Sequence, residues 1–179
     1  MTGELERLAG GRRGHFAFPW GFHGDLWLDL DLLFVDPGAI APYASELARR
    51  VPRCDVVCGP MVGGALLAQL TAGEVGAELA WTEMPSYELP AALRSRLAGR
   101  RVVVVDDAIN AGSAVSATID SLRSCGAAVV GVGALMVQGA YATELPCAWL
   151  ERVESGLWPA GSCPLCEAGV PVDQRTPAG

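Results

Sequence analysis

The feature that most constrains the fold is a run of four valines, Val102–Val105, followed directly by two aspartates. β-Branched residues favour extended backbone, and four in succession without polar alternation predict a strand that is buried on both faces. Strands of this kind occur almost only in parallel sheets that helices cover on both sides. The run therefore predicts an α/β fold with a strand at 101–105 inside a mainly parallel sheet.

Segments on either side of this strand alternate between helical and extended patterns. Apolar spacing and Gly or Pro boundaries predict four helices, at 37–51, from Gly63-Gly64 onward, at 91–97 and at 112–124. Short apolar runs predict strands at 55–59, 77–81 and 128–137, and an edge strand at 147–153. Strand, glycine loop, helix and strand follow one another, which is the βαβ order of a parallel sheet.

The two ends differ in character from this alternating core. Residues 1–14 form a polar lead-in, and 15–35 concentrate aromatic residues and both histidines, with a half-exposed strand expected over Leu26–Leu32. Residues 156–179 are rich in Gly and Pro and are expected to wrap the domain. At 179 residues the chain fits one domain, 1–179, with a cap at about 14–36, a core at about 37–153 and a tail at about 154–179.

Charge and composition exclude several classes of partner. The net charge is −7, all 13 basic residues are Arg, and no basic run is longer than two. Nucleic acids and anionic membrane surfaces need a basic patch, so neither is expected as a partner. No apolar window approaches a membrane span and the first residues lack a signal-peptide core, so we expect a cytoplasmic protein with reduced thiols.

The residues with the clearest chemistry follow the valine strand. In α/β sheets ligands bind beyond the carboxyl ends of strands, and a small-residue loop before a helix offers N–H groups to a phosphate. The adjacent acids suit ribose hydroxyls or a shared divalent cation. A structural interpretation is that Asp107 caps a turn and Asp106 is solvated. The segment comprises Asp106, Asp107, Ala108, Ile109, Asn110, Ala111, Gly112, Ser113 and Ala114.

This block resembles the signature of type I phosphoribosyltransferases: four apolar residues, two acids and a loop of small residues. The resemblance implies that Asp106 and Asp107 meet the ribose of phosphoribosyl pyrophosphate (PRPP), with Mg²⁺ held directly or indirectly, and that 108–114 cradle the 5′-phosphate. It also implies a five-stranded, mainly parallel sheet flanked by helices, a small N-terminal β-containing hood, and a homodimer. Asn110-Ala111-Gly112 stands where the family usually has Thr-Thr-Gly, so Ser113 carries more of the phosphate contact.

Two further segments are similar to the family. The pyrophosphate loop corresponds to Gly59, Pro60, Met61, Val62, Gly63 and Gly64, for which a plain strand-to-helix turn is the structural alternative. The N-terminal aromatic segment resembles the hood of the orotate phosphoribosyltransferase branch. On that resemblance, Phe18, Trp20, His23 and Gln138 are the candidate contacts to the base. It implies an enzyme that transfers a phosphoribosyl group from PRPP to a pyrimidine-type base and releases pyrophosphate.

Departures from the pattern of the orotate phosphoribosyltransferase branch suggest an alternative function. The family carries lysines in the hood and on a mobile catalytic loop, whereas this chain has none; Arg94 and Arg96 are the catalytic candidates in that loop. Gln138 stands where an Arg pairs the substrate carboxylate, which makes a neutral base easier to accommodate. The alternative is a non-catalytic PRPP- or nucleotide-binding paralogue that has lost the catalytic lysines.

The tail holds one further motif, Cys163-Pro164-Leu165-Cys166. Two cysteines at this spacing can bind one zinc ion, but a structural zinc site needs four ligands. Cys54 and Cys58, Cys147, or the same pair of a second copy are the candidate partners; packing thiols and a redox pair are the alternatives. His15 is interpreted as structural, while His23 is either structural or a phosphate or base contact.

Overall fold

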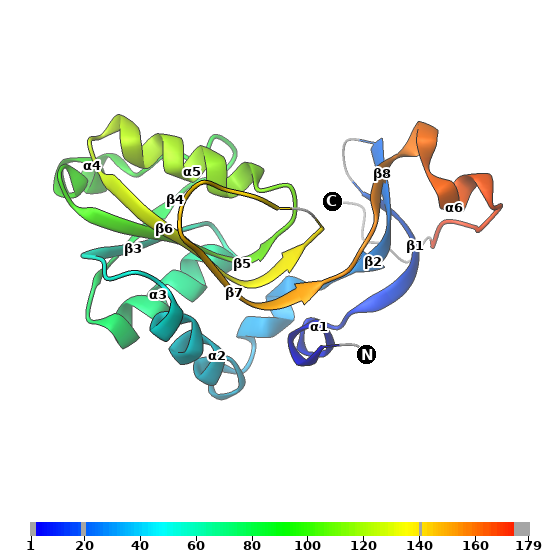
Figure 1. The fold of residues 1–179 in the computed structure, drawn as a ribbon, viewed down its shortest axis with the longest axis horizontal. Coiled ribbons are helices and arrows are strands. Elements are labelled where there is room, and N and C mark those ends of the chain that lie inside the picture. The colour runs from blue at the N-terminus through cyan, green and yellow to red at the C-terminus, as the bar shows by residue number, and fades with distance from the viewer. Residues whose placement is uncertain (1–2, 19–20, 140, 174–179) are drawn as a thin grey trace.

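The computed structural model describes residues 3–18, 21–139 and 141–173. Its two sheets lie at opposite ends of the molecule: a helix-covered core and a smaller hood, joined by the long ribbon that leaves β7 (Figure 1). Within the described residues no helix is both long enough and apolar enough to cross a bilayer.

The core sheet has five strands in the order β4-β3-β5-β6-β7, and every neighbouring pair is parallel. This confirms the predicted fold class. In that order the strands are Glu78–Thr82, Val56–Pro60, Arg101–Ile109, Ala128–Gln138 and Cys147–Val153. The central strand β5 is longer than predicted, because its pairing with β6 continues from Asp106↔Ala134 to Ile109↔Val137. The two acids therefore lie within the strand rather than after it.

Helices cover both faces of this sheet, as the valine run predicts (Figure 1). Val103 and Val105 pack in one buried cluster with side chains of α2 and α3, whereas Val102 and Val104 pack in the other with side chains of α4 and α5. The four helices are α2 (Pro37–Arg50), α3 (Gly63–Val75), α4 (Ala91–Leu97) and α5 (Ser113–Ser124). Alternation along one strand thus divides the core into two layers.

Helix ends follow the local sequence. Asp36 caps α2 by accepting a hydrogen bond from the Gly38 N–H at 2.8 Å, and Pro37 occupies the first turn, where no donor is missed. Gly76 ends α3 in the left-handed region at φ 68°. These signals explain why the predicted helix bounds agree with the structure to within a residue or two.

The hood is an antiparallel sheet of β1 (Arg12–Phe18), β2 (Phe22–Trp27) and β8 (Leu157–Pro159) in the order β1-β2-β8. The predicted strand over Leu26–Leu32 is wrong beyond Trp27: Leu30–Phe34 forms a 3₁₀ helix, η2, which buries Leu33 in the core. The apolar spacing there serves a helical turn rather than a strand. The lead-in also contains a short helix, α1 (Glu4–Leu8), with Leu5 buried.

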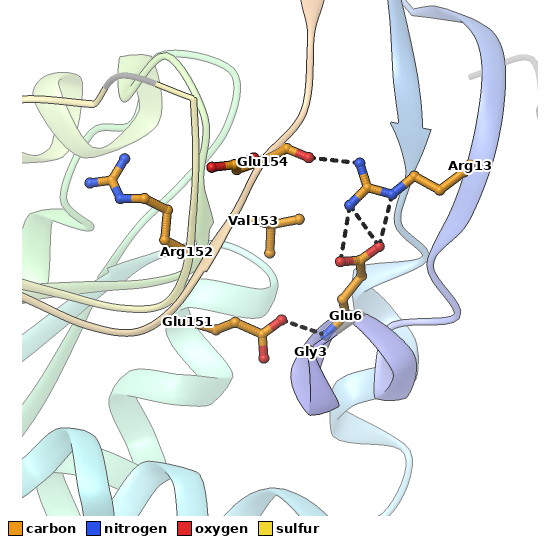
Figure 2. Close-up of a pocket in the computed structure, with 7 residues that line it drawn as sticks. All are labelled: Gly3, Glu6, Arg13, Glu151, Arg152, Val153 and Glu154. Atoms are coloured by element: carbon orange, nitrogen blue, oxygen red, sulfur yellow. Dashed lines mark hydrogen bonds and ion pairs between the residues drawn. The ribbon is translucent and has the colours of Figure 1, made fainter. Parts of the chain in front are cut away.

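The tail is part of the hood instead of a separate wrapping. After β8 it forms a 3₁₀ turn, η3 (Ala160–Ser162), and a short helix, α6 (Pro164–Glu167). The end of β7 and the ribbon after it are tied to the N-terminal segment. Glu151 of β7 accepts hydrogen bonds from the Leu5 and Glu6 N–H groups of α1. Arg13 bridges the Glu6 carboxylate and the Glu154 carbonyl, as Figure 2 shows. The cavity of about 610 Å³ at this junction is lined mainly by charged residues, of which Arg13 and Glu6 form an ion pair.

Candidate active site

Two buried carboxylates form the centre of the candidate site. Asp106 is 7% and Asp107 9% exposed, near the carboxyl end of β5. Each accepts a backbone hydrogen bond, Asp106 from the Asp107 N–H at 3.1 Å and Asp107 from the Ala108 N–H at 2.7 Å. Burial raises the pKa of both carboxyls, and the neighbouring Asp107 charge raises that of Asp106 further, well above its usual range.

No cation balances this pair in the part of the chain that the structure describes, since neither carboxylate takes part in an ion pair there. Two adjacent acids buried without a counter-charge cost free energy unless a ligand or an ion satisfies them. Carboxylate oxygens are ligands that Mg²⁺ prefers, so the donor set fits a divalent cation bound directly or through water.

The predicted pyrophosphate loop touches these acids. β3 ends at Pro60 and α3 begins at Gly63, so the loop lies at the same edge of the sheet. A Cβ on Gly63 would lie 1.8 Å from an Asp107 oxygen, and one on Gly64 would lie 2.7 Å from an Asp106 oxygen. Only glycine allows this approach, so the two segments, some 40 residues apart, form one site.

The third segment, 108–114, turns from β5 into α5. Gly112 adopts φ 80° at the N-cap of α5, and a Cβ there would meet the Tyr141 ring at 2.4 Å. No side chain caps the helix at that position. The N–H groups of the first turn from Ser113 onward, together with the helix dipole, make this end of α5 suitable for binding a phosphate.

A cavity of about 180 Å³ connects this loop with the hood. Two of the predicted base contacts, Phe18 and Gln138, line it beside Ala108 and Asn110 of the loop. Sequence reasoning missed its other lining residues: Leu26, Leu28, Leu30, Ser155, Gly156 and Leu157. None of these lining side chains is charged. A neighbouring cavity of about 500 Å³ shares Asn110, Ser155 and Leu157 and includes Tyr141.

The missed residues have no local signature in the sequence. Ser155 and Leu157 belong to a segment expected to be tail, and they reach the cavity because β8 pairs with β2 at Gly24↔Leu157. Only the alternation of apolar residues over Leu26–Leu30 could have indicated a lining face. The hood therefore contributes more to the cavity than the predicted aromatic contacts.

Three predicted site residues, His23, Arg94 and Arg96, do not line this cavity. His23 is on the opposite face of the hood sheet from Phe18, because it pairs with Ala17 while Phe18 pairs with Phe22. Its prediction as a base contact is not supported, since its ring contacts His15 and Cys166 instead. Trp20 lies outside the described residues.

The two loop arginines are engaged in ion pairs. Arg94 donates to Glu88 at 2.7 Å and to the Leu89 carbonyl at 3.0 Å. Arg96 pairs at 3.2 Å with Glu78, the first residue of β4, and so lies toward the amino edge of the sheet. This arrangement places Arg96 away from the acids and leaves Arg94 beside the loop that follows β4.

Comparison with known proteins finds a protein family and relatives that this chain resembles. Residues 39–151 match the model of the phosphoribosyl transferase domain family. The chain is 30% identical over 173 residues to an orotate phosphoribosyltransferase of Caldanaerobacter subterraneus subsp. tengcongensis, covering 94% of this chain and 91% of that protein. An orotate phosphoribosyltransferase of Thermus thermophilus is 28% identical, with 96% and 97% covered.

Solved structures share the fold. The orotate phosphoribosyltransferase of Aeropyrum pernix superimposes with a TM-score of 0.66 at 23% identity, over 83% of this chain and 91% of that one. The adenine phosphoribosyltransferase of Thermoanaerobacter pseudethanolicus gives 0.68 at 20% identity, over 84% and 98%. At these identities the likeness establishes the architecture alone.

Proposed function

This chain belongs to the phosphoribosyl transferase domain family, and we propose that it transfers a phosphoribosyl group from PRPP to a pyrimidine-type base, releasing pyrophosphate. The observation that carries the proposal is the contact between Gly63 and Gly64 of one loop and the carboxylates of Asp107 and Asp106. It joins an anion-binding turn and a pair of acids, which are the two features that a phosphorylated ribose requires.

Each segment has a part in binding PRPP. Asp106 and Asp107 accept hydrogen bonds from the ribose hydroxyls, as ionised carboxylates do. The N–H groups of 108–114 and the Ser113 hydroxyl donate to the 5′-phosphate. The pyrophosphate lies against the loop from Gly59 to Gly64, whose three glycines let the backbone pack closely against the two acids and the start of α3.

Mg²⁺ fits this arrangement because the two acids are buried without a cation partner among the described residues. When bound with PRPP, the ion would neutralise charge that develops on the departing pyrophosphate. The protein's own contribution is to position the ribose and phosphate against the base cavity and to exclude water from it.

The base occupies the cavity between hood and core, between Phe18 and Gln138. The Gln138 amide both donates and accepts hydrogen bonds, as the polar edge of a pyrimidine also does. Orotate is the first base to test because the similar curated proteins bear that name. Uracil is the second, because the described lining of the cavity offers no cation for a carboxylate.

A homodimer is part of the proposal. Met61, Val62 and Leu66 expose apolar side chains around the start of α3, at 39%, 54% and 44%. Such a group of apolar side chains, two of them on the rim of the pyrophosphate loop itself, is suited to pairing with a second copy. Light scattering on the purified protein tests this directly, and a mass equal to one chain would contradict it.

The second candidate function is a PRPP-binding protein without turnover. The absence of lysine from the whole sequence favours it, because no lysine can supply positive charge to the leaving group. Arg94, beside the loop after β4, is the cationic side chain we propose for that part in the enzyme.

One experiment separates the two candidates. Purified protein is incubated with Mg²⁺, PRPP and either orotate or uracil, and the nucleoside 5′-monophosphate is identified by mass spectrometry while pyrophosphate is measured in the same sample. The enzyme proposal predicts both products in equal amounts. Saturable PRPP binding without either product establishes the binding protein instead, and failure to bind PRPP overturns both.

A further inference from the structure

Four metal-ligating side chains converge on the far side of the hood. The ligand atoms of His15, His23, Cys163 and Cys166 all lie within 4.8 Å of one another. They come from three separate elements: β1, β2 and the start of the tail helix α6. Among groups of three or more His, Cys, Asp or Glu side chains in the described residues, this is the one whose ligand atoms lie close enough together to hold a metal ion.

The distances resemble the edges of a tetrahedral zinc site. Zn–N bonds of about 2.0–2.1 Å and Zn–S bonds of about 2.3 Å imply ligand separations of roughly 3.3–3.8 Å around a tetrahedron. In the structure His15 Nε2 lies 2.9 Å from His23 Nδ1, 3.5 Å from Cys163 Sγ and 3.7 Å from Cys166 Sγ. His23 Nδ1 lies 3.2 Å from Cys166 Sγ.

Hydrogen bonding alone does not account for this convergence. The His15 Nδ1–H donates to the Val170 carbonyl at 2.7 Å, which leaves Nε2 with one lone pair. Three polar atoms approach that single nitrogen, whereas one lone pair accepts one proton. A cation that all four atoms bind satisfies them together. The bond to Val170 is also the outer contact that orients metal-binding imidazoles in proteins.

Charge and burial are consistent with zinc. Two thiolates and two neutral imidazoles carry the charge that balances Zn²⁺, and Cys₂His₂ is a recurrent structural zinc set. Cys163 and His15 are buried, at 0% and 2% exposed, so metal would occupy a site largely closed to water. Cys166 is exposed and gives the ion a path of entry.

We propose that His15, His23, Cys163 and Cys166 bind one zinc ion that fastens the tail to the hood. The tail cysteines thus find partners in the hairpin, and the partners considered from the sequence, Cys54, Cys58 and Cys147, lie on or beside the core sheet. The site is on the opposite face of the hood from the base cavity, because His23 faces away from Phe18. Zinc would hold β8, and with it Leu157, in place at that cavity.

The experiment is independent of catalysis. The full chain is purified under reducing conditions, supplied with Zn²⁺, freed of excess metal and analysed for metal content and for melting temperature with and without a strong chelator. Cobalt replaces zinc in a parallel sample, because thiolate-bound tetrahedral Co²⁺ has characteristic absorption. The variants are Cys166→Ser, at an exposed ligand, and Cys125→Ser as the control, where a hydroxyl can keep the hydrogen bond to the Leu122 carbonyl.

The proposal predicts about one zinc per chain in the wild type and in Cys125→Ser, a chelator-dependent drop in melting temperature, and a thiolate-to-cobalt band. Cys166→Ser is predicted to lose the band and the chelator response while still folding. Substoichiometric metal after reconstitution, or zinc retained equally by Cys166→Ser, would overturn it. So would a Cys163–Cys166 disulfide that persists in reductant.

Discussion

Replacing Gly63 with alanine tests whether the pyrophosphate loop and the acids form one site. The new Cβ would lie 1.8 Å from an Asp107 oxygen, whereas ordinary contacts begin near 3.4 Å, so one of the two must move by about 1.6 Å. Misplacing a binding group by about 1 Å can cost about 100-fold in rate, or about 2.7 kcal/mol of transition-state stabilisation.

The matched control is Gly73→Ala in the same helix. Nothing lies within 4 Å of a Cβ there, so the substitution is expected to leave activity unchanged and to stabilise α3 by about 0.5–1 kcal/mol. Gly63→Ala is expected to lower kcat/KM for PRPP about 100-fold and to cost about 1–3 kcal/mol of folding stability. Pyrophosphate release and thermal unfolding measure the two effects. PRPP kinetics within about twofold of wild type in Gly63→Ala would refute the reasoning.

Three other predictions address the charge, the phosphate and the base. The pKa of Asp106 is raised in the folded protein, so the stability that its protonated carboxyl contributes is present below the unfolded pKa of 3.8 and is lost as pH rises through the folded pKa. Asp106→Asn is therefore expected to raise the melting temperature of the ligand-free protein at neutral pH, and this gain is expected to shrink toward pH 4. A gain that does not depend on pH would contradict this prediction. Ser113→Ala removes one donor to the phosphate and is expected to raise KM for PRPP about 10-fold, equivalent to about 1.4 kcal/mol, while Ser116→Ala, one turn further along α5, is expected to leave it unchanged. Gln138→Arg supplies a cation to the base cavity and is expected to favour orotate over uracil by about 10- to 100-fold in the ratio of kcat/KM; an unchanged ratio would remove Gln138 from the base contacts.

The core of the fold follows from local signals. The valines of β5 specify a strand buried on both faces, and the glycines and Asp36 mark helix ends close to where the structure has them. The candidate site follows for the same reason: in a parallel sheet the carboxyl ends of neighbouring strands share one edge, so Pro60 and Asp106 are brought together by topology alone.

The hood depends on contacts that no local pattern encodes. β8 is only three residues long, and its partner β2 lies near the other end of the sequence. The segment was therefore predicted to be part of the tail. The alternation over Leu26–Leu32 predicts a strand, yet Leu30–Phe34 forms a 3₁₀ helix, because packing Leu33 into the core outweighs a weak local preference.

The ligands of the proposed zinc site show what the sequence reveals and what it leaves out. The Cys163–Cys166 spacing is visible in the sequence, but its partners lie far away on another element. His15 and His23 share a face of the hood because Ala17 pairs with His23, and His15 lies two positions before Ala17 in β1. That register was the missing information, since the pairing of β1 with β2 shifts between Arg13 and Phe16 and a regular alternation does not predict the shift.

The most direct test of the central claim is the melting temperature of the protein with Mg²⁺ and PRPP, in the wild type and in the Asp106→Asn/Asp107→Asn double variant. At about 100 times the dissociation constant, a ligand that binds only the folded state adds about 2.7 kcal/mol of stability. The account predicts that upward shift in the wild type and none in the double variant. An equal shift in both, or no shift in the wild type, would contradict the assignment of the PRPP site to these two carboxylates.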